Sequence, residues 1–159
     1  MRLLSQGTEK SLIVILDPPK EAGMATLKVD DNIWNYLPNV DRTMKVPASM
    51  MSGAWMGSHF SNDDLVKESR MADDYTFAIT QRPGDNDEDL YVVECTPHPD
   101  APVVWGKVVV KVREDRIPTE ITYWDEQGEL ARTMLFEEIR EMGGRTVPTR
   151  MKLVPADKP

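Results

Sequence analysis

Short segments in which apolar and polar residues alternate recur along most of this 159-residue chain, and they constrain its fold more than any other feature. In the sequence WGKVVVKVRE, Val108, Val110 and Val112 alternate with Lys107 and Lys111. Successive side chains of a β-strand point to opposite faces of the sheet, so this pattern indicates one buried and one solvated face. We therefore predict a half-buried strand here.

Similar segments, separated by turn residues, fill most of the chain. Segment 130–142 has a composition that favours helix, but the loop 125–129 and Gly143-Gly144 bracket it as hairpin turns would, so we predict a strand. About ten short strands make a largely antiparallel sheet, which at this width must curl into a barrel or half-barrel, or split into a sandwich. The other predicted strands are residues 11–16, 25–29, 33–37, 42–46, 75–82, 89–96, 117–124 and 146–154.

One short helix is predicted over residues 61–69. Ser61 is a good N-cap, and Asp63 and Asp64 lie in the first turn, where carboxylates interact favourably with the helix dipole. A helix of about two turns is too short to be stable alone, so packing must hold it.

Length and charge narrow the classes of function. A chain of 159 residues with 40% hydrophobic content is expected to form a single domain over residues 1–159. Its net charge of −8 argues against binding nucleic acid or anionic lipid headgroups. No apolar run is long enough to span a bilayer. Cys95 is the single cysteine, and its apolar neighbours favour a small buried thiol over a reactive one.

Candidate catalytic and metal sites are weak. His59 lies near Asp63 and Asp64, but these acids already suit a helix start, and a transition-metal site needs several ligands in one geometry. No GxSxG elbow or glycine-rich phosphate loop occurs. The acidic loop 85–89 leaves a weak calcium site open as an alternative to a solvated turn, without the EF-hand spacing. We therefore expect no enzyme, no metal and no cofactor.

Residues 48–60, ASMMSGAWMGSHF, form a segment that we call the Met/Trp segment. It strings methionines and aromatic residues among Gly and Ser, which discourage regular structure. Methionine adapts to irregular shapes and recurs at promiscuous apolar binding surfaces. Two interpretations stay open: a fixed plug on the concave face of the sheet, or a displaceable cover over a lipid-sized cavity. In segment 33–37, Trp34 and Tyr36 share one face, with core packing as the default and a ligand cavity as the alternative.

The stretch LKVDDNIWNYLPNVDRTMKVPASMMSGAWMGSHFSNDDLVKESRMADDY resembles the central block of the outer-membrane lipoprotein-sorting protein family, which is related to the LolA carrier. The stretches IPTEITYWDEQGELARTMLFEEI and VPTRMKLVP are also similar to that family. The resemblance implies a LolA-like fold, an antiparallel half-barrel with a short helix and an apolar loop covering its concave face. It also implies that this chain is a fragment, without the family's signal peptide, N-terminal helix and last strand.

The resemblance further implies a non-enzymatic periplasmic carrier that shelters the acyl chains of lipids or lipoproteins, with an inner-membrane transporter as a further partner. The alternative is a protein-interaction module that docks onto an envelope transporter through the Met/Trp segment. A fragment with unpaired strand edges is also expected to dimerise. The residues expected to line or cover the apolar cavity are Ile33, Trp34, Leu37, Met50, Met51, Trp55, Met56 and Phe60.

Overall fold

The computed structural model describes residues 1–67, 71–85, 89–101 and 103–156. The chain folds into two compact units, unit 1 over Met1–Met71 and unit 2 over Ala72–Pro159, and each is described by itself. A single domain over residues 1–159 stays a prediction, because the contacts define the two units separately.

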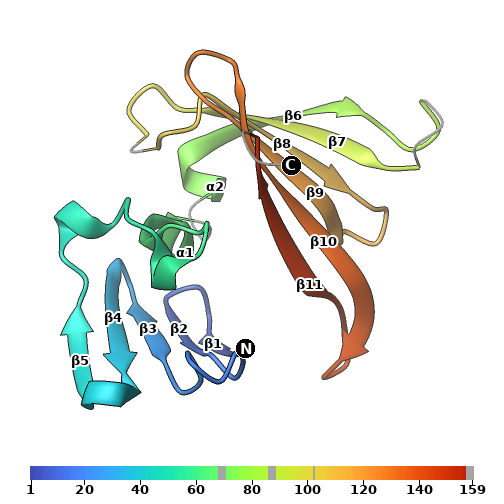
Figure 1. The fold of residues 1–159 in the computed structure, drawn as a ribbon. Helices are drawn as coiled ribbons and strands as arrows, with labels where there is room; N and C mark the ends of the chain where they lie inside the picture. Colours follow the sequence, from blue (N-terminus) through green and yellow to red (C-terminus); the bar gives the residue numbers. More distant parts are fainter. Residues whose placement is uncertain (68–70, 86–88, 102, 157–159) are drawn as a thin grey trace. The chain divides into compact units, whose positions relative to one another are not determined.

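Unit 1 contains a five-stranded antiparallel sheet whose strands follow one another in chain order (Figure 1). Its strands are β1 (Arg2–Gln6), β2 (Lys10–Val14), β3 (Ala25–Val29), β4 (Asn32–Leu37) and β5 (Arg42–Lys45). The register is continuous: Leu12 pairs with Leu27, Leu27 with Trp34, and Trp34 with Lys45. Side chains that share one such row lie on the same face of the sheet.

Short helical turns complete unit 1. They are the 3-10 turns η1 (Pro38–Val40), η2 (Ala48–Met50) and η3 (Trp55–Gly57) and the helix α1 (Asn62–Lys67). The backbone N–H of Ser61 donates to Asp64 Oδ2 at 2.8 Å, and the backbone N–H of Asp64 donates to Ser61 Oγ at 3.2 Å. This reciprocal capping box confirms the predicted helix start. A second helix, α2 (Met71–Asp74), was not predicted from the sequence.

Unit 2 contains a six-stranded antiparallel sheet in the order β11-β10-β9-β8-β7-β6. The last two strands are the longest and curve together as a hairpin (Figure 1). The long strand β10 confirms the prediction of strand over helix for residues 130–142. The strands are β6 (Tyr75–Gln81), β7 (Tyr91–Pro97), β8 (Lys107–Val112), β9 (Pro118–Trp124), β10 (Leu130–Met142) and β11 (Arg145–Pro155).

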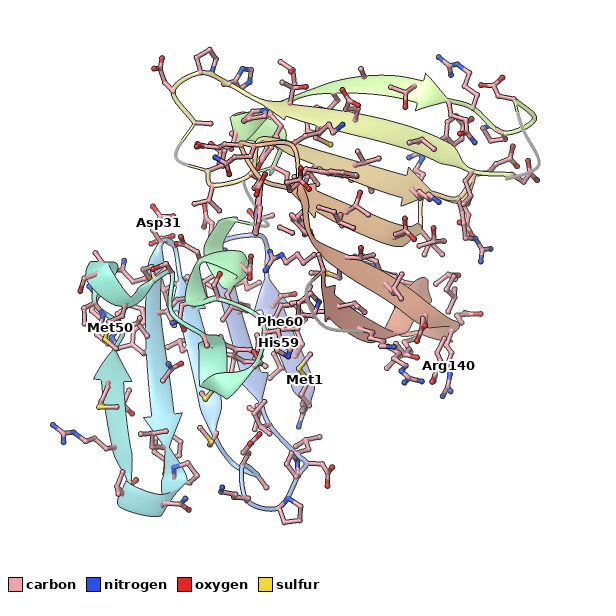
Figure 2. The ribbon with its side chains drawn as sticks, turned by 45° about the horizontal axis from the view of Figure 1, so that its top comes forward. Met1, Asp31, Met50, His59, Phe60 and Arg140 are labelled. Carbon is pink, nitrogen blue, oxygen red and sulfur yellow. The ribbon has the colours of Figure 1, made fainter. Side chains whose placement is uncertain are left out.

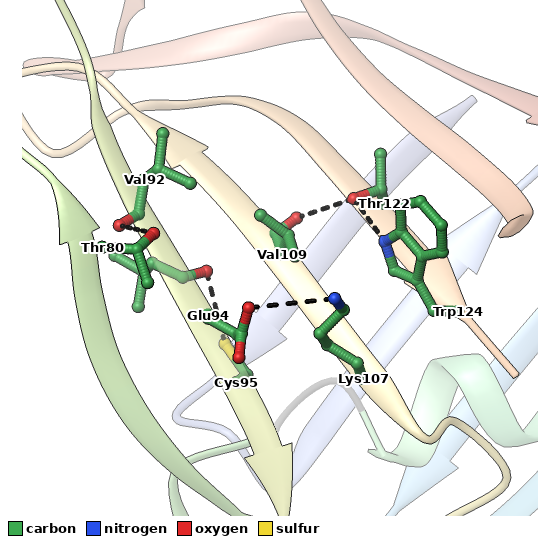
Figure 3. Close-up of polar contacts among 9 residues, drawn as sticks. Thr80, Val92, Glu94, Cys95, Lys107, Val109, Thr122 and Trp124 are labelled. Atoms are coloured by element: carbon green, nitrogen blue, oxygen red, sulfur yellow. Dashed lines mark hydrogen bonds and ion pairs between the residues drawn. The ribbon is translucent and has the colours of Figure 1, made fainter. Parts of the chain in front are cut away.

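The two faces of this second sheet differ in chemistry. One face is apolar and holds Cys95, Val108, Tyr123 and Met134, all buried and in neighbouring registers. The other face is polar, as Figure 3 shows: Lys107 pairs with Glu94 at 3.8 Å. The half-buried strand with one wet face that we predicted around Val108 is thereby confirmed.

The fold class is therefore confirmed as mainly β, antiparallel and open. The sequence analysis left open whether the strands would curl into one sheet or split into two, and it did not indicate the division into five strands and six. Alternation identifies strands and their faces but carries no information on which strands pair.

Candidate apolar ligand site

The Met/Trp segment lies across one face of the sheet in unit 1 (Figure 2). The contact is made by Trp55, whose buried indole donates from Nε1 to Thr26 Oγ1 at 2.8 Å. The hydroxyl of Thr26 donates in turn to Asn35 Oδ1 at 2.7 Å. We call the side of the sheet that carries Thr26 and Asn35 the covered face.

Hydrogen bonds within the segment hold it in a compact shape. The backbone N–H of Trp55 donates to the carbonyl of Phe60 at 2.6 Å, which closes a short loop between them. The buried side chain of Asn62 donates from Nδ2 to the carbonyls of Met50 at 3.1 Å and Gly53 at 3.2 Å. Because the loop satisfies much of its own backbone, it can keep its shape without being built into the sheet.

Met56 has a strained backbone. Its φ of 51° lies in the left-handed region, which costs a non-glycine residue of order 1 kcal/mol or more. Gly57 follows with a φ of 71°, where the lack of a Cβ avoids that cost. Together these two residues make the sharp turn that carries the chain from Trp55 towards Phe60.

The structure separates the predicted site residues. Ile33, completely buried, and Leu37 lie on the covered face, because they alternate along β4 with Trp34. Trp34 lies on the opposite face, so the structure does not bring it together with Ile33. Within the Met/Trp segment Trp55 is buried and Met50 exposed, while the half-buried members are Met51, Met56 and Phe60.

The opposite side of the sheet, which we call the open face, holds an apolar pocket of about 350 Å³. The sequence analysis placed Trp34 and Tyr36 on one face, with a ligand cavity as the alternative to core packing, but it missed the other lining residues. If the pairing of β2, β3 and β4 had been known, the alternation along these strands would have placed the lining side chains on one face. The pocket is lined by Leu12, Ala25, Leu27, Val29, Trp34, Tyr36 and Thr43.

The covered face also carries a buried cation. Lys28 lies next to Thr26 along the face and is almost fully buried, and its Nζ donates to the carbonyl of Thr8 at 2.8 Å. A buried ammonium needs such a partner to offset its lost hydration. Lys28 on β3 pairs directly with Ile33 on β4, so the covered face places a buried cation beside a buried apolar side chain.

Other candidate groups take structural positions. Asp63 and Asp64 lie in the first turn of α1, as predicted, and His59 is exposed. Within the described ranges, no three His, Cys, Asp or Glu residues are placed to hold a metal ion together. The proposed calcium loop 85–89 falls partly outside the described residues.

None of the helices in the described part of the chain has the length and apolar character to cross a membrane.

Cys95 is fully buried, as predicted, on the apolar face of the second sheet. Burial, followed by the charge of Glu94, raises the pKa of its thiol to about 11. Burial also raises the pKa of the neighbouring Tyr75 to about 12, with smaller contributions from Asp74 and Cys95. A thiol held neutral in this way is a poor nucleophile.

A family model described only as "uncharacterized protein" matches residues 7–159 of the chain. Among curated proteins, none matches the sequence significantly. The sequence match therefore covers nearly the whole chain, while similarity to known proteins comes from solved structures.

Three solved structures share the fold over nearly the whole chain. A LolA superfamily protein from Nitrosomonas europaea is 26% identical, with a TM-score of 0.68 over 97% of this chain and 68% of that one. A domain assigned to outer-membrane lipoprotein sorting from Vibrio parahaemolyticus is 22% identical, with a TM-score of 0.73 over 98% and 68%. A DUF1329 family protein from Desulfovibrio piger is 22% identical, with a TM-score of 0.79 over 94% and 65%. The chain thus spans about two thirds of the length of each.

Proposed function

The chain belongs to the family whose model matches residues 7–159 and has the LolA-like fold, and on that premise we propose that it is a non-enzymatic carrier of acyl chains. In this proposal the acyl chain of a lipid or lipoprotein lies between the covered face of unit 1 and the Met/Trp segment. The segment is then a cover that opens, and not a fixed plug.

The observation that carries the proposal is the way the cover is attached. Trp55 joins the segment to the covered face through a side-chain hydrogen bond to Thr26, and the other hydrogen bonds described above for the segment lie within it or tie it to Asn62 at the start of α1. A cover that keeps its own shape can move away as a unit once this hydrogen bond and the packing of the buried Trp55 side chain are released. The methionines around the latch can repack around chains of different length.

The free energy gained by burying an acyl chain can offset the cost of breaking the hydrogen bond between Trp55 and Thr26. Breaking one buried hydrogen bond costs about 1–3 kcal/mol if its groups stay unpaired. Burying an acyl chain gains about 0.8 kcal/mol per methylene. Two to four methylenes therefore offset the opened latch, and the remainder of a long chain supplies net affinity.

Ile33 and Leu37 would form the floor of this site, and Met50, Met51, Met56 and Phe60 its cover around Trp55. The name of the Vibrio structure, a lipoprotein-sorting domain, supports lipoprotein acyl chains as cargo. It also supports a periplasmic location, and we propose an inner-membrane transporter as the source of the cargo. The solved structures of similar fold give no support to the alternative, in which the Met/Trp segment docks onto such a transporter without lipid.

Lipid extraction from the purified protein, followed by mass spectrometry, tests the proposal. We expect co-purified acyl lipids, and saturable uptake of an uncharged fluorescent monoacylglycerol by the delipidated protein. Trp55→Ser should reduce that uptake, whereas Trp124→Phe, on the polar face of the second sheet, should not. Absence of both extracted lipid and uptake would overturn the proposal.

A further inference from the structure

The open face of unit 1 combines an apolar row with positive charge. Leu4, Leu12, Leu27 and Trp34 face one another across four strands, and the next residue in the row is Lys45 on β5. The ammonium of Lys45 lies 5.6 Å from the centre of the Trp34 ring. The row thus runs from leucines to an aromatic ring and ends at a cation.

The open face is exposed to solvent at the middle strand of the sheet, where the apolar row passes through Leu27. Leu27 exposes 41% of its surface, although it is an apolar residue in the middle strand of the sheet. The pocket of about 350 Å³ over this row lies within the size range of small-molecule sites, and nearly all of its lining is apolar. Contiguous exposed apolar surface is one of the features that mark ligand and interaction sites.

The charge on this face has one sign. The alternate positions that share it along the five strands include Arg2, Lys10 and Lys45 but no Asp or Glu. The carboxylates near this face belong to the turns at the strand ends. One of them, Asp41, accepts a hydrogen bond from the Tyr36 hydroxyl at 2.9 Å. In a chain of net charge −8, a strand face with cations alone is a local reversal of the overall charge.

We propose that the open face binds a single anionic amphiphile, a molecule with one alkyl chain and one negatively charged head. The alkyl chain lies along the row from Leu4 to Trp34, and the head is held by Lys45, with Lys10 and Arg2 adding longer-range attraction. Three interstrand spacings separate β1 from β4, about 14 Å, which sets the length of alkyl chain that the row can cover.

The geometry favours a free amphiphile over an anionic bilayer. A bilayer presents many negative heads to the whole protein, whose net charge of −8 opposes close approach. A single molecule meets only the local cations and the concave pocket. This site lies on the face opposite the proposed acyl-carrier site, so it does not depend on that function.

Binding of laurate, measured by calorimetry on the whole protein, tests the inference. We expect saturable binding of laurate and much weaker binding of dodecyltrimethylammonium, which has the same alkyl chain with a positive head. Lys45→Glu should lower laurate affinity about tenfold or more, because it reverses the charge at the head. Leu27→Gln should lower it by weakening the apolar row.

Met44→Gln is a matched control. Met44 precedes Lys45 on β5, exposes 42% of its surface against 41% for Leu27, and points to the covered face. It should leave laurate affinity unchanged.

Three results would overturn the inference. One is equal affinity for the anionic and cationic amphiphiles, and another is an equal effect of Met44→Gln and Leu27→Gln. The third is binding to phosphatidylglycerol vesicles without binding of free laurate, which would assign the face to a bilayer instead. Circular dichroism of each variant confirms that a lost signal does not reflect unfolding.

Discussion

Trp55 and Thr26 are 29 residues apart in sequence, yet the indole Nε1 of Trp55 donates to the hydroxyl of Thr26 at 2.8 Å in a buried environment. Thr26 also donates to Asn35, so one hydroxyl links the Met/Trp segment to two strands of the sheet. This small hydrogen-bonded chain attaches the Met/Trp segment to its sheet.

Thr26→Val keeps the shape of the side chain but leaves the indole N–H and the Asn35 carbonyl oxygen without this partner. We expect unit 1 to lose about 2 kcal/mol of stability, since unpaired buried polar groups cost about 1–3 kcal/mol. Urea unfolding and hydrogen exchange of the Trp55 indole proton both measure the change. Thr43→Val, on the open face, is the control, and an equal loss in both variants would contradict the role of the latch.

In unit 2, Arg132 is buried with its guanidinium carbon 4.7 Å from the Trp105 ring centre and 4.4 Å from that of Tyr123. Desolvated cation–π contacts are worth about 2 kcal/mol, against about 0.5–1 at exposed sites. Arg132→Met should therefore destabilise the protein by about 2 kcal/mol. Lys107→Met removes a cation 5.1 Å from the Trp124 ring on the polar face and should cost less than about 1 kcal/mol. Denaturant titration measures both losses of stability. A larger loss for Lys107→Met than for Arg132→Met would refute the stabilising role of the buried cation–π contacts.

The stability of unit 2 should fall at high pH. The folded protein raises the pKa of Cys95 from an ordinary value of 9.0 to about 11, so folding favours the neutral thiol. That contribution is complete below pH 9 and is lost as the pH rises from 9 through 11, because the thiol of the unfolded chain ionises in this window while the buried thiol stays protonated. Cys95→Ala should flatten the decline of the unfolding free energy over this window. A slope that is the same in both proteins would contradict the burial effect.

Strand edges should make the protein self-associate. β6 borders the six-stranded sheet, and Phe77 on this strand exposes 52% of its surface. Unpaired edges with apolar side chains favour pairing with another chain. We expect concentration-dependent dimers by light scattering, and Phe77→Lys should weaken them. A monomer at high concentration in the unmodified protein would exclude this form of association.

The sequence predicted the elements better than their assembly. Alternation around Val108 identified β8, and the turn residues that bracket 130–142 overrode its helical composition and identified β10 correctly. Ser61 as an N-cap, with Asp63 and Asp64 in the first turn, predicted the start of α1. In contrast, α2 has four residues, too few to show a helical period.

The candidate site was predictable only in part for the same reason. Alternation places Ile33 and Trp34 on opposite faces of β4, which the structure confirms, but it cannot tell which face a distant loop will cover. The bond between Trp55 and Thr26 depends on tertiary packing across 29 residues, and no local pattern encodes it. The open pocket likewise needed the register that brings Leu12, Leu27 and Trp34 into one row.

The central claim, that an acyl chain lies between the covered face and the Met/Trp segment, is tested most directly by fluorescence quenching of Trp55. A variant that keeps Trp55 alone, with Trp34, Trp105 and Trp124 changed to Phe, is titrated with an uncharged monoacylglycerol brominated along its chain. Bromine quenches an indole only at contact, so the account predicts saturable quenching of Trp55, and none for the same lipid without bromine. An unchanged Trp55 signal in a folded variant that still binds the lipid would contradict it.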